Sequence, residues 1–180
     1  PKTEGLMRAL VRSGELATLA PERVWQEISR GLMESHPSRM LAVLRQCGAL
    51  AALLPEVDAL YGVPQPPAHH PEVDAGVHVA QALDYAAGRE ASLPVRYAVL
   101  AHDLGKGATP RDRWPRHVAH EARSVRFAER MSERLRVPAE CRDAARLVAR
   151  YHADVANAES LRPSTLLDLL LAADALRRPE

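Results

Sequence analysis

Apolar side chains recur three and four positions apart along most of this chain, and the alternation typical of β-strands is nearly absent. Proline precedes several of these segments, as at Pro21 and Pro37, where its missing N–H is tolerated in the first turn of a helix. The pattern therefore predicts an all-α fold. The helices expected in the first 60 residues cover 6–19, with a bend at Ser13-Gly14, then 21–33, 37–48 and 49–54.

Residues 61–72 are the strongest candidate linker, because four prolines in these twelve positions prevent a continuous helix. We expect a small helical domain over 1–62 and a second helical bundle over 63–180. The sequence contains no internal repeat and no low-complexity tract. The helices predicted in the second part lie near 73–88, 94–104, 117–136, 139–153 and 164–178.

Composition limits the class of protein but does not identify its binding partner. The chain has 180 residues, 47% of them hydrophobic, which allows a sizeable core. A net charge of +1 argues against a massively basic nucleic-acid coat and leaves room for a local basic face. The two cysteines form no CxxC pair, and neither a signal-peptide pattern nor a long apolar run is present. We therefore expect a cytoplasmic protein with no membrane association, and its start at Pro1 predicts a piece of a longer protein.

The stretch VLAHDLGKG at 99–107 places a histidine, a carboxylate and a lysine at the end of an apolar segment. In a helix running to residue 104, His102 and Asp103 would project about 100° apart from one turn, so that both can bind one ion. Gly105 suits the left-handed residue that ends a helix, and Lys106 could then reach over the ion to hold a phosphate oxygen. A His-Asp dipeptide alone is more often a surface pair or a core histidine than a pair of ligands.

Polar residues that interrupt apolar helical stripes supply further candidate ligands. His78, His152 and Asp174 each continue an otherwise apolar face. A buried carboxylate such as Asp174 needs a partner, and a metal ion, Arg177 or Arg178 would each satisfy it. His78 alone fits a core histidine better than a ligand.

Two imidazoles and two carboxylates form a mixed nitrogen and oxygen ligand set. Such a set suits Mn, Fe, Co, Ni or Mg with open positions better than a closed structural zinc site. His117 and His120, spaced three apart, fit either the solvated start of a helix or a place at the site. The predicted metal ligands are His78, His102, Asp103 and Asp174, with His120, His152 and Lys106 near by.

The order H…HD…D resembles the HD superfamily of metal-dependent phosphohydrolases. Longer segments resemble bacterial CCA-adding enzymes of the multifunctional type, which are tRNA nucleotidyltransferases that carry an HD domain. The chain departs from that pattern at Val118 and Ala119, where glycines are expected, and at Ala153 after His152. The similar segments are PERVWQEI at 21–28, RQCGALAALLPEVDALYGVPQP at 45–66, HHPEVDAGVH at 69–78, HDLGKG at 102–107 and WPRHVAH at 114–120.

The resemblance implies hydrolysis of 2′,3′-cyclic phosphates, 2′-nucleotides and other phosphomonoesters, with a divalent ion such as Ni²⁺, Mg²⁺ or Mn²⁺. His120 and His152 would orient substrate, supply a proton or hold a second ion. The first 60 residues resemble the helical region that carries tRNA in this family. The chain has neither the glycine-rich nucleotide loop nor the paired-aspartate motif of a nucleotidyltransferase, so we expect no CCA addition from it.

Two other functions stay open. The chain fits a tRNA-binding helical module with a vestigial or regulatory HD site, or an HD hydrolase of nucleoside triphosphates or signalling nucleotides, and self-association is open in each case. Arg111, Arg113 and Arg116 could steer a nucleotide phosphate or belong to a solvated loop. The basic residues that could contact tRNA phosphates are Lys2, Arg8, Arg12, Arg23, Arg30, Arg39 and Arg45.

Overall fold

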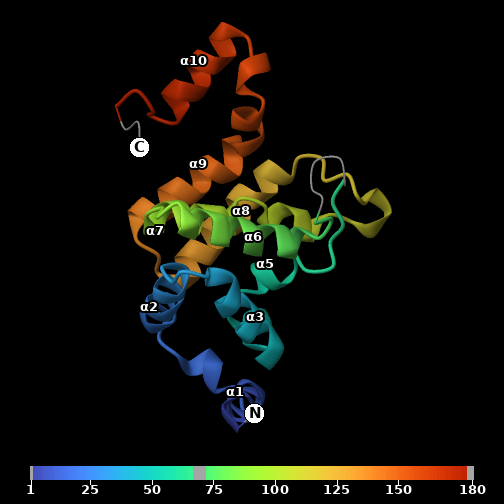
Figure 1. Ribbon diagram of the computed structural model, residues 1–180, viewed down its shortest axis with the longest axis vertical. Helices are drawn as coiled ribbons and strands as arrows, with labels where there is room; N and C mark the ends of the chain where they lie inside the picture. The colour runs from blue at the N-terminus through green and yellow to red at the C-terminus, as the bar shows by residue number, and fades with distance from the viewer. Residues whose placement is uncertain (1, 67–71, 178–180) are drawn as a thin grey trace.

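A computed structural model describes residues 2–66 and 72–177, and across these ranges the chain is helical with no β-strand (Figure 1). The all-α prediction is confirmed. Some predicted features lie outside the described residues: His69 and His70 of the linker, Arg178 as a partner for Asp174, and the side chain of Lys2. No described helix is both long enough and apolar enough to span a bilayer.

The first part of the chain forms short helices whose starts follow the prolines. Pro21 and Pro37 occupy the first turns of their helices as predicted, and Gly48 separates two helices with a φ of 82°, which favours glycine. The elements are α1 (Lys2–Arg12), the 3-10 helix η1 (Glu15–Thr18), α2 (Pro21–Leu32), α3 (Pro37–Cys47), α4 (Ala49–Leu53) and α5 (Pro55–Asp58).

The second part contains the longest helices. Three of them are shorter than predicted, at ends that matter for the site: one stops at Ala101, one starts at His120 and one stops at Ala172. The elements are α6 (Ala75–Gly88), α7 (Leu93–Ala101), η2 (Leu104–Ala108), η3 (Arg111–Arg113), α8 (His120–Leu135), α9 (Ala139–Ala156), η4 (Ala158–Ser160) and α10 (Pro163–Ala172).

One buried apolar cluster joins the two parts of the chain. Helix α2 contributes Trp25, Ile28 and Leu32, and the Trp25 ring meets Tyr97 of α7 edge to face with centroids 5.2 Å apart. Helices α7, α8 and α9 pack against one another and carry the rest of this cluster. The core therefore does not divide at residue 62, and the division into domains 1–62 and 63–180 stays a prediction.

Helix α10 lies beyond the end of α9, apart from the other helices (Figure 1). Its apolar face is mostly exposed, with Leu167 at 50% and Leu171 at 59% of full exposure. The stripe that was expected to bury Asp174 is therefore not packed against the bundle.

Candidate metal centre

Asp103 lies where α7 has ended and η2 begins, and its side chain is 1% exposed. Four histidines from different elements surround its carboxylate. His102 precedes it in the chain, His78 comes from α6, His120 from the first position of α8 and His152 from α9. The structure thus brings together five of the predicted site residues from positions that span 75 residues of sequence.

The two carboxylate oxygens of Asp103 face different histidine pairs. Oδ2 lies 3.1 Å from His102 Nε2 and 3.9 Å from His78 Nε2. Oδ1 lies 3.2 Å from His120 Nε2 and 3.6 Å from His152 Nε2. Asp103 therefore belongs to two groups of candidate ligands, one with His78 and His102 and the other with His120 and His152. Within each group the candidate ligand atoms all lie within 4.8 Å of one another.

Each of the four imidazoles has an acceptor at its other ring nitrogen. The Nδ1 atoms of His102, His120 and His152 lie 2.7, 3.0 and 3.0 Å from backbone carbonyl oxygens. His78 Nδ1 instead lies 2.6 Å from a carboxylate oxygen of Glu72. In a neutral ring, an acceptor at Nδ1 favours the tautomer whose proton is on Nδ1, which leaves the Nε2 lone pair for a metal ion. Without an ion, burial would lower the pKa of His102, but the Asp103 carboxylate outweighs this effect and raises it, so that His102 Nε2 can donate to that carboxylate.

Two features of this cluster fit a bound cation. Asp103 Oδ1 is fully buried and accepts no hydrogen bond from the described residues, which is costly for an ionised oxygen. His120 Nε2 and His152 Nε2 lie 3.3 Å apart, and with both protons on Nδ1 two lone pairs would face each other. A proton or a metal ion between these atoms relieves both problems.

The pKa values follow from burial and from the close charges. Burial would raise the pKa of Asp103, but His102, His120 and Lys106 together hold it well below its usual value. Burial lowers the pKa of His78 and of His152, and the neighbouring His102 lowers both further. These two rings are therefore neutral near pH 7, the form in which imidazole binds a metal.

Local structure fixes the elements that carry these side chains. The Asp74 carboxylate accepts from the N–H groups of Gly76 and Val77 at 2.8 and 3.0 Å, so it caps the start of α6 one turn before His78. Gly105 packs against the first turn of α8, and a Cβ atom there would lie 2.1 Å from the His120 carbonyl oxygen. Gly105 is therefore needed for close approach and does not adopt the left-handed conformation that the sequence suggested.

The structure does not place Lys106 where a phosphate clamp would be. Its side chain is buried, and Nζ donates to Asp103 Oδ2 at 2.7 Å and to Gln65 Oε1. The cause is the short helix η2, which turns the chain back against α8 instead of leaving an open loop. In this structure Lys106 thus holds Asp103 in place, and its reach over the ion to a phosphate stays a prediction that would require these contacts to break.

The structure also does not bring Asp174 to the cluster. Its carboxylate accepts from the Arg177 guanidinium at 2.7 Å, in a pair that is largely exposed. Apolar periodicity predicts a helix that continues to residue 178, whereas α10 ends at Ala172 and Asp174 turns away with a φ of 54°. Arg177, which the sequence allowed as the alternative partner, is the partner here.

The remaining predicted residues lie outside the ring of histidines. His117 is buried and forms hydrogen bonds with Thr109 Oγ1 and the Pro64 carbonyl oxygen. These bonds join the backbone at Pro64 to the loop before α8. Arg111, Arg113 and Arg116 are exposed, and the Arg111 guanidinium lies over the Trp114 ring at 5.6 Å. Their role in steering a phosphate stays a prediction.

Sequence reasoning missed two residues that contact the cluster. Glu72 contacts His78, and Gln65 contacts Lys106, and both come from the proline-rich segment that was interpreted as a linker. No periodicity marks these positions because neither residue is in a helix. The only signal was that both fall within segments that resemble the family.

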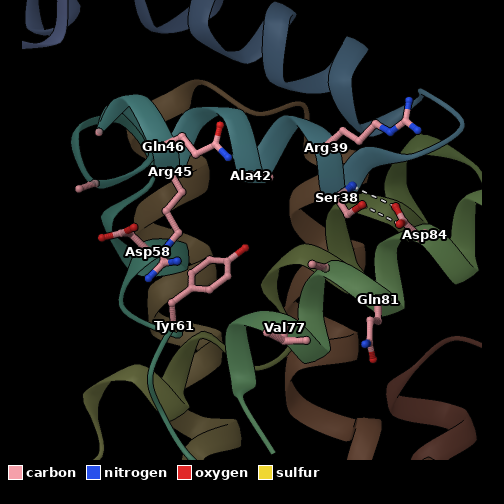
Figure 2. A pocket seen from close by; sticks show the side chains of 13 residues that line it. Ser38, Arg39, Ala42, Arg45, Gln46, Asp58, Tyr61, Val77, Gln81 and Asp84 are labelled. Carbon is pink, nitrogen blue, oxygen red and sulfur yellow. Dashed lines mark hydrogen bonds between the residues drawn. The ribbon is translucent and has the colours of Figure 1, made fainter. Parts of the chain in front are cut away.

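A second feature is the groove between α3 and α6, with a volume of about 760 Å³. Figure 2 shows Arg39 and Arg45 projecting from α3 on one side, with Gln81 on α6 across from them. The Arg45 guanidinium lies 4.3 Å from the centre of the Tyr61 ring. Asp84 accepts from the Ser38 N–H and hydroxyl at 3.0 and 2.6 Å, which joins the two helices at one end of the groove.

The cluster of histidines around a buried aspartate, carried by a helical bundle, is the kind of site that defines an HD domain. The HD-domain family matches residues 75–178, more than half of the chain, and the chain belongs to that family. Residues 1–61 match a second family, described as the probable RNA- and SrmB-binding site of polymerase A. The family match and the ligand geometry support a metal-dependent hydrolase.

Among curated proteins the chain is similar to several called multifunctional CCA protein. It is 60% identical over all 180 residues to that of Nitrosospira multiformis, and covers 44% of that protein. It is 60% identical over 178 residues to that of Nitrosomonas europaea and 57% identical over 180 residues to that of Cupriavidus metallidurans. The chain thus spans less than half the length of these relatives. No solved structure matches it.

Proposed function

We propose that this chain is a metal-dependent phosphohydrolase that acts on 2′,3′-cyclic phosphates, 2′-nucleotides and other phosphomonoesters, including those at tRNA 3′ ends. One observation carries the proposal: four Nε2 atoms surround the buried Asp103 carboxylate, and each of these rings has an acceptor at Nδ1. The similarity to multifunctional CCA proteins supports the choice of substrates.

In this proposal His78, His102 and Asp103 hold one divalent ion, and Asp103, His120 and His152 hold a second. A set rich in imidazole favours Ni²⁺ over Mg²⁺. When bound, the ion supplies a Lewis acid for a phosphoryl oxygen and lowers the pKa of a water molecule toward neutrality.

The side chains of the protein have their own tasks. Lys106 keeps the Asp103 carboxylate ionised and oriented, because it donates to Oδ2 from a buried position. If an ion binds only to His78, His102 and Asp103, then His152 is free to move a proton. Burial lowers the pKa of His152, so its neutral imidazole can accept a proton and return it to the departing oxygen. The Nε2 atom of His120 lies 3.3 Å from Nε2 of His152, so the two rings can share that proton.

A ligand role for Asp174 requires α10 to move, because its carboxylate is paired with Arg177 in this structure. We propose that Asp174 binds the ion only if α10 moves in this way. The Asp174→Asn variant tests it: Mn²⁺ affinity at the wild-type value means that α10 stays apart, and a loss of about tenfold or more means that α10 closes on the centre.

The hydrolase proposal is tested with 2′,3′-cyclic AMP and a chromogenic phosphodiester, using protein loaded with Mn²⁺ or Ni²⁺. We expect hydrolysis that a chelator abolishes and Asp103→Asn removes, while Asp168→Asn at an exposed position of α10 retains it. Activity that survives chelation, or full activity in Asp103→Asn, would show that the metal mechanism is wrong.

A second function, binding of tRNA by residues 1–62, is favoured by the RNA-binding family match and by the groove in Figure 2. Arg39 and Arg45 line that groove, and phosphate contacts of this kind weaken steeply as salt rises. We expect Arg39→Ala with Arg45→Ala to reduce tRNA affinity and its salt dependence, whereas Arg146→Ala, which removes a pair with Glu129 outside residues 1–62, leaves both unchanged. The absence of any complex at low salt would overturn this function for the chain.

A further inference from the structure

Two buried side-chain atoms in the described ranges have no hydrogen-bond partner, and both belong to one short series of contacts. Lys106 Nζ donates to Asp103 Oδ2 at 2.7 Å on one side and to Gln65 Oε1 on the other. The unpartnered atoms are the two far ends of this series, Asp103 Oδ1 and Gln65 Nε2. One is an acceptor and the other a donor, so they suit ligands of opposite charge.

The orientation of the Gln65 carboxamide is fixed. An ammonium group only donates, so it must face Oε1, and turning the amide over would set two donors against each other. The backbone is held as well, because Gln65 N–H donates to the Val73 carbonyl at 2.6 Å and His117 Nε2 lies 2.8 Å from the Pro64 carbonyl. The position of Nε2 is therefore set by its surroundings.

The acceptor end of the series, Asp103 Oδ1, is explained by the cation proposed above. The donor end remains to be explained, because Gln65 is 1% exposed and a buried amide N–H without an acceptor is costly. Native proteins satisfy such groups with an ordered water or a ligand. Among the described residues Lys106 alone connects Gln65 to the Asp103 carboxylate, so an anionic oxygen of a ligand on the ion is the fitting acceptor, since the ion and the amide donor both stabilise its charge.

We propose that Gln65 binds a phosphoryl oxygen of the ligand through Nε2 while its Oε1 keeps Lys106 on Asp103. The inference rests on the proposed function, because it needs the cation beside Asp103. It also makes Gln65, which lies between the two family matches, part of the site. The phosphate contact that the sequence suggested for Lys106 falls to Gln65 instead.

The test measures inorganic phosphate binding to the Mn²⁺-loaded protein by calorimetry, with Mn²⁺ affinity measured separately. Gln65→Glu keeps an oxygen for Lys106 and replaces the donor with an acceptor. We expect its phosphate affinity to fall about tenfold or more, with no loss of Mn²⁺ affinity and no loss of folding. Gln65→Met removes both contacts and should weaken phosphate binding as well. Gln26→Glu, the same change at an exposed position of α2, should leave phosphate affinity unaltered.

The outcomes separate this inference from the proposed function. Phosphate affinity within twofold of wild type in Gln65→Glu would overturn the role of Gln65 and leave the metal centre intact. Parallel losses of Mn²⁺ affinity, phosphate affinity and melting temperature in Gln65→Glu would show that the residue is only structural. Wild-type protein that takes up no Mn²⁺ would refute the proposed function, and the inference with it. If Gln65→Met does not fold, Gln65→Glu decides alone.

Discussion

At Asp103, burial and charge act in opposite directions. Burial alone would raise the pKa of this carboxyl, yet the imidazoles and the Lys106 ammonium around it keep the pKa well below its usual value. The carboxylate therefore stays ionised inside the protein, with Oδ1 available to a ligand. The arrangement makes Asp103 the one side chain that both histidine pairs share.

Removing Lys106 should reveal this role. In Lys106→Met the buried Asp103 loses one of its compensating charges, and we expect the metal-free protein to lose about 3–5 kcal/mol of stability in denaturant unfolding. Mn²⁺ should then stabilise the variant more than the wild type, because the ion replaces the missing positive charge. Arg116→Met, at an exposed position, serves as the control. Unchanged stability with only a raised KM would instead support the phosphate clamp.

The sequence allowed some of these residues to be placed and not others. His78, His102, His120 and His152 each follow a helical face or end, so periodicity could indicate that they meet. Asp174 lies apart from the cluster here because its helix ends two residues earlier, and helix ends are the least certain part of a periodicity argument, so its ligand role stays a prediction. Gln65 and Glu72 could not be predicted because they lie outside the helices.

Among the elements, the junction between α7, η2 and α8 decides the geometry of the centre. Helix α7 stops at Ala101, so Asp103 turns inward, and η2 then packs against α8. The Gly105 N–H donates to Ser124 Oγ at 2.8 Å, and Arg123 Nε donates to the Gly105 carbonyl at 3.0 Å. These contacts hold His120 and Asp103 at a fixed separation.

A methyl group at Gly105 should disturb this junction. Its Cβ would meet the His120 carbonyl at 2.1 Å, so η2 and α8 must separate. We expect Gly105→Ala to lose about 1–3 kcal/mol of stability and to bind Mn²⁺ more weakly. Gly88→Ala, where the Cβ would meet nothing within 4 Å, is the matched control. Equal melting temperatures and equal Mn²⁺ affinities for the two variants would contradict the account.

For the whole molecule, the main finding is a buried core to which both predicted domains contribute. The proline-rich segment suggested a linker, but part of it contacts the metal centre, and α2 packs on α7 and α8. Proline content indicates where a helix cannot run, and it carries no information about what such a segment contacts. The helical class could be predicted, whereas the way the two parts join required the structure.

A truncation tests whether the two parts are independent. Removing residues 1–62 would expose the Tyr97 ring, which packs against Trp25, and the apolar face of α6. We expect residues 63–180 alone to unfold at a clearly lower temperature than the whole chain, by circular dichroism, because apolar burial in the core is lost. A fragment that melts cooperatively at the temperature of the whole chain would show that the domains are independent.

The central claim is that four histidines and Asp103 hold divalent metal, and anomalous diffraction from Mn²⁺-soaked crystals tests it most directly. We predict anomalous peaks beside the Asp103 carboxylate, at coordination distance from His78 and His102 Nε2 and, where a second ion binds, from His120 and His152 Nε2. Full soaking without a peak at Asp103, or peaks only at exposed carboxylates, would contradict the account.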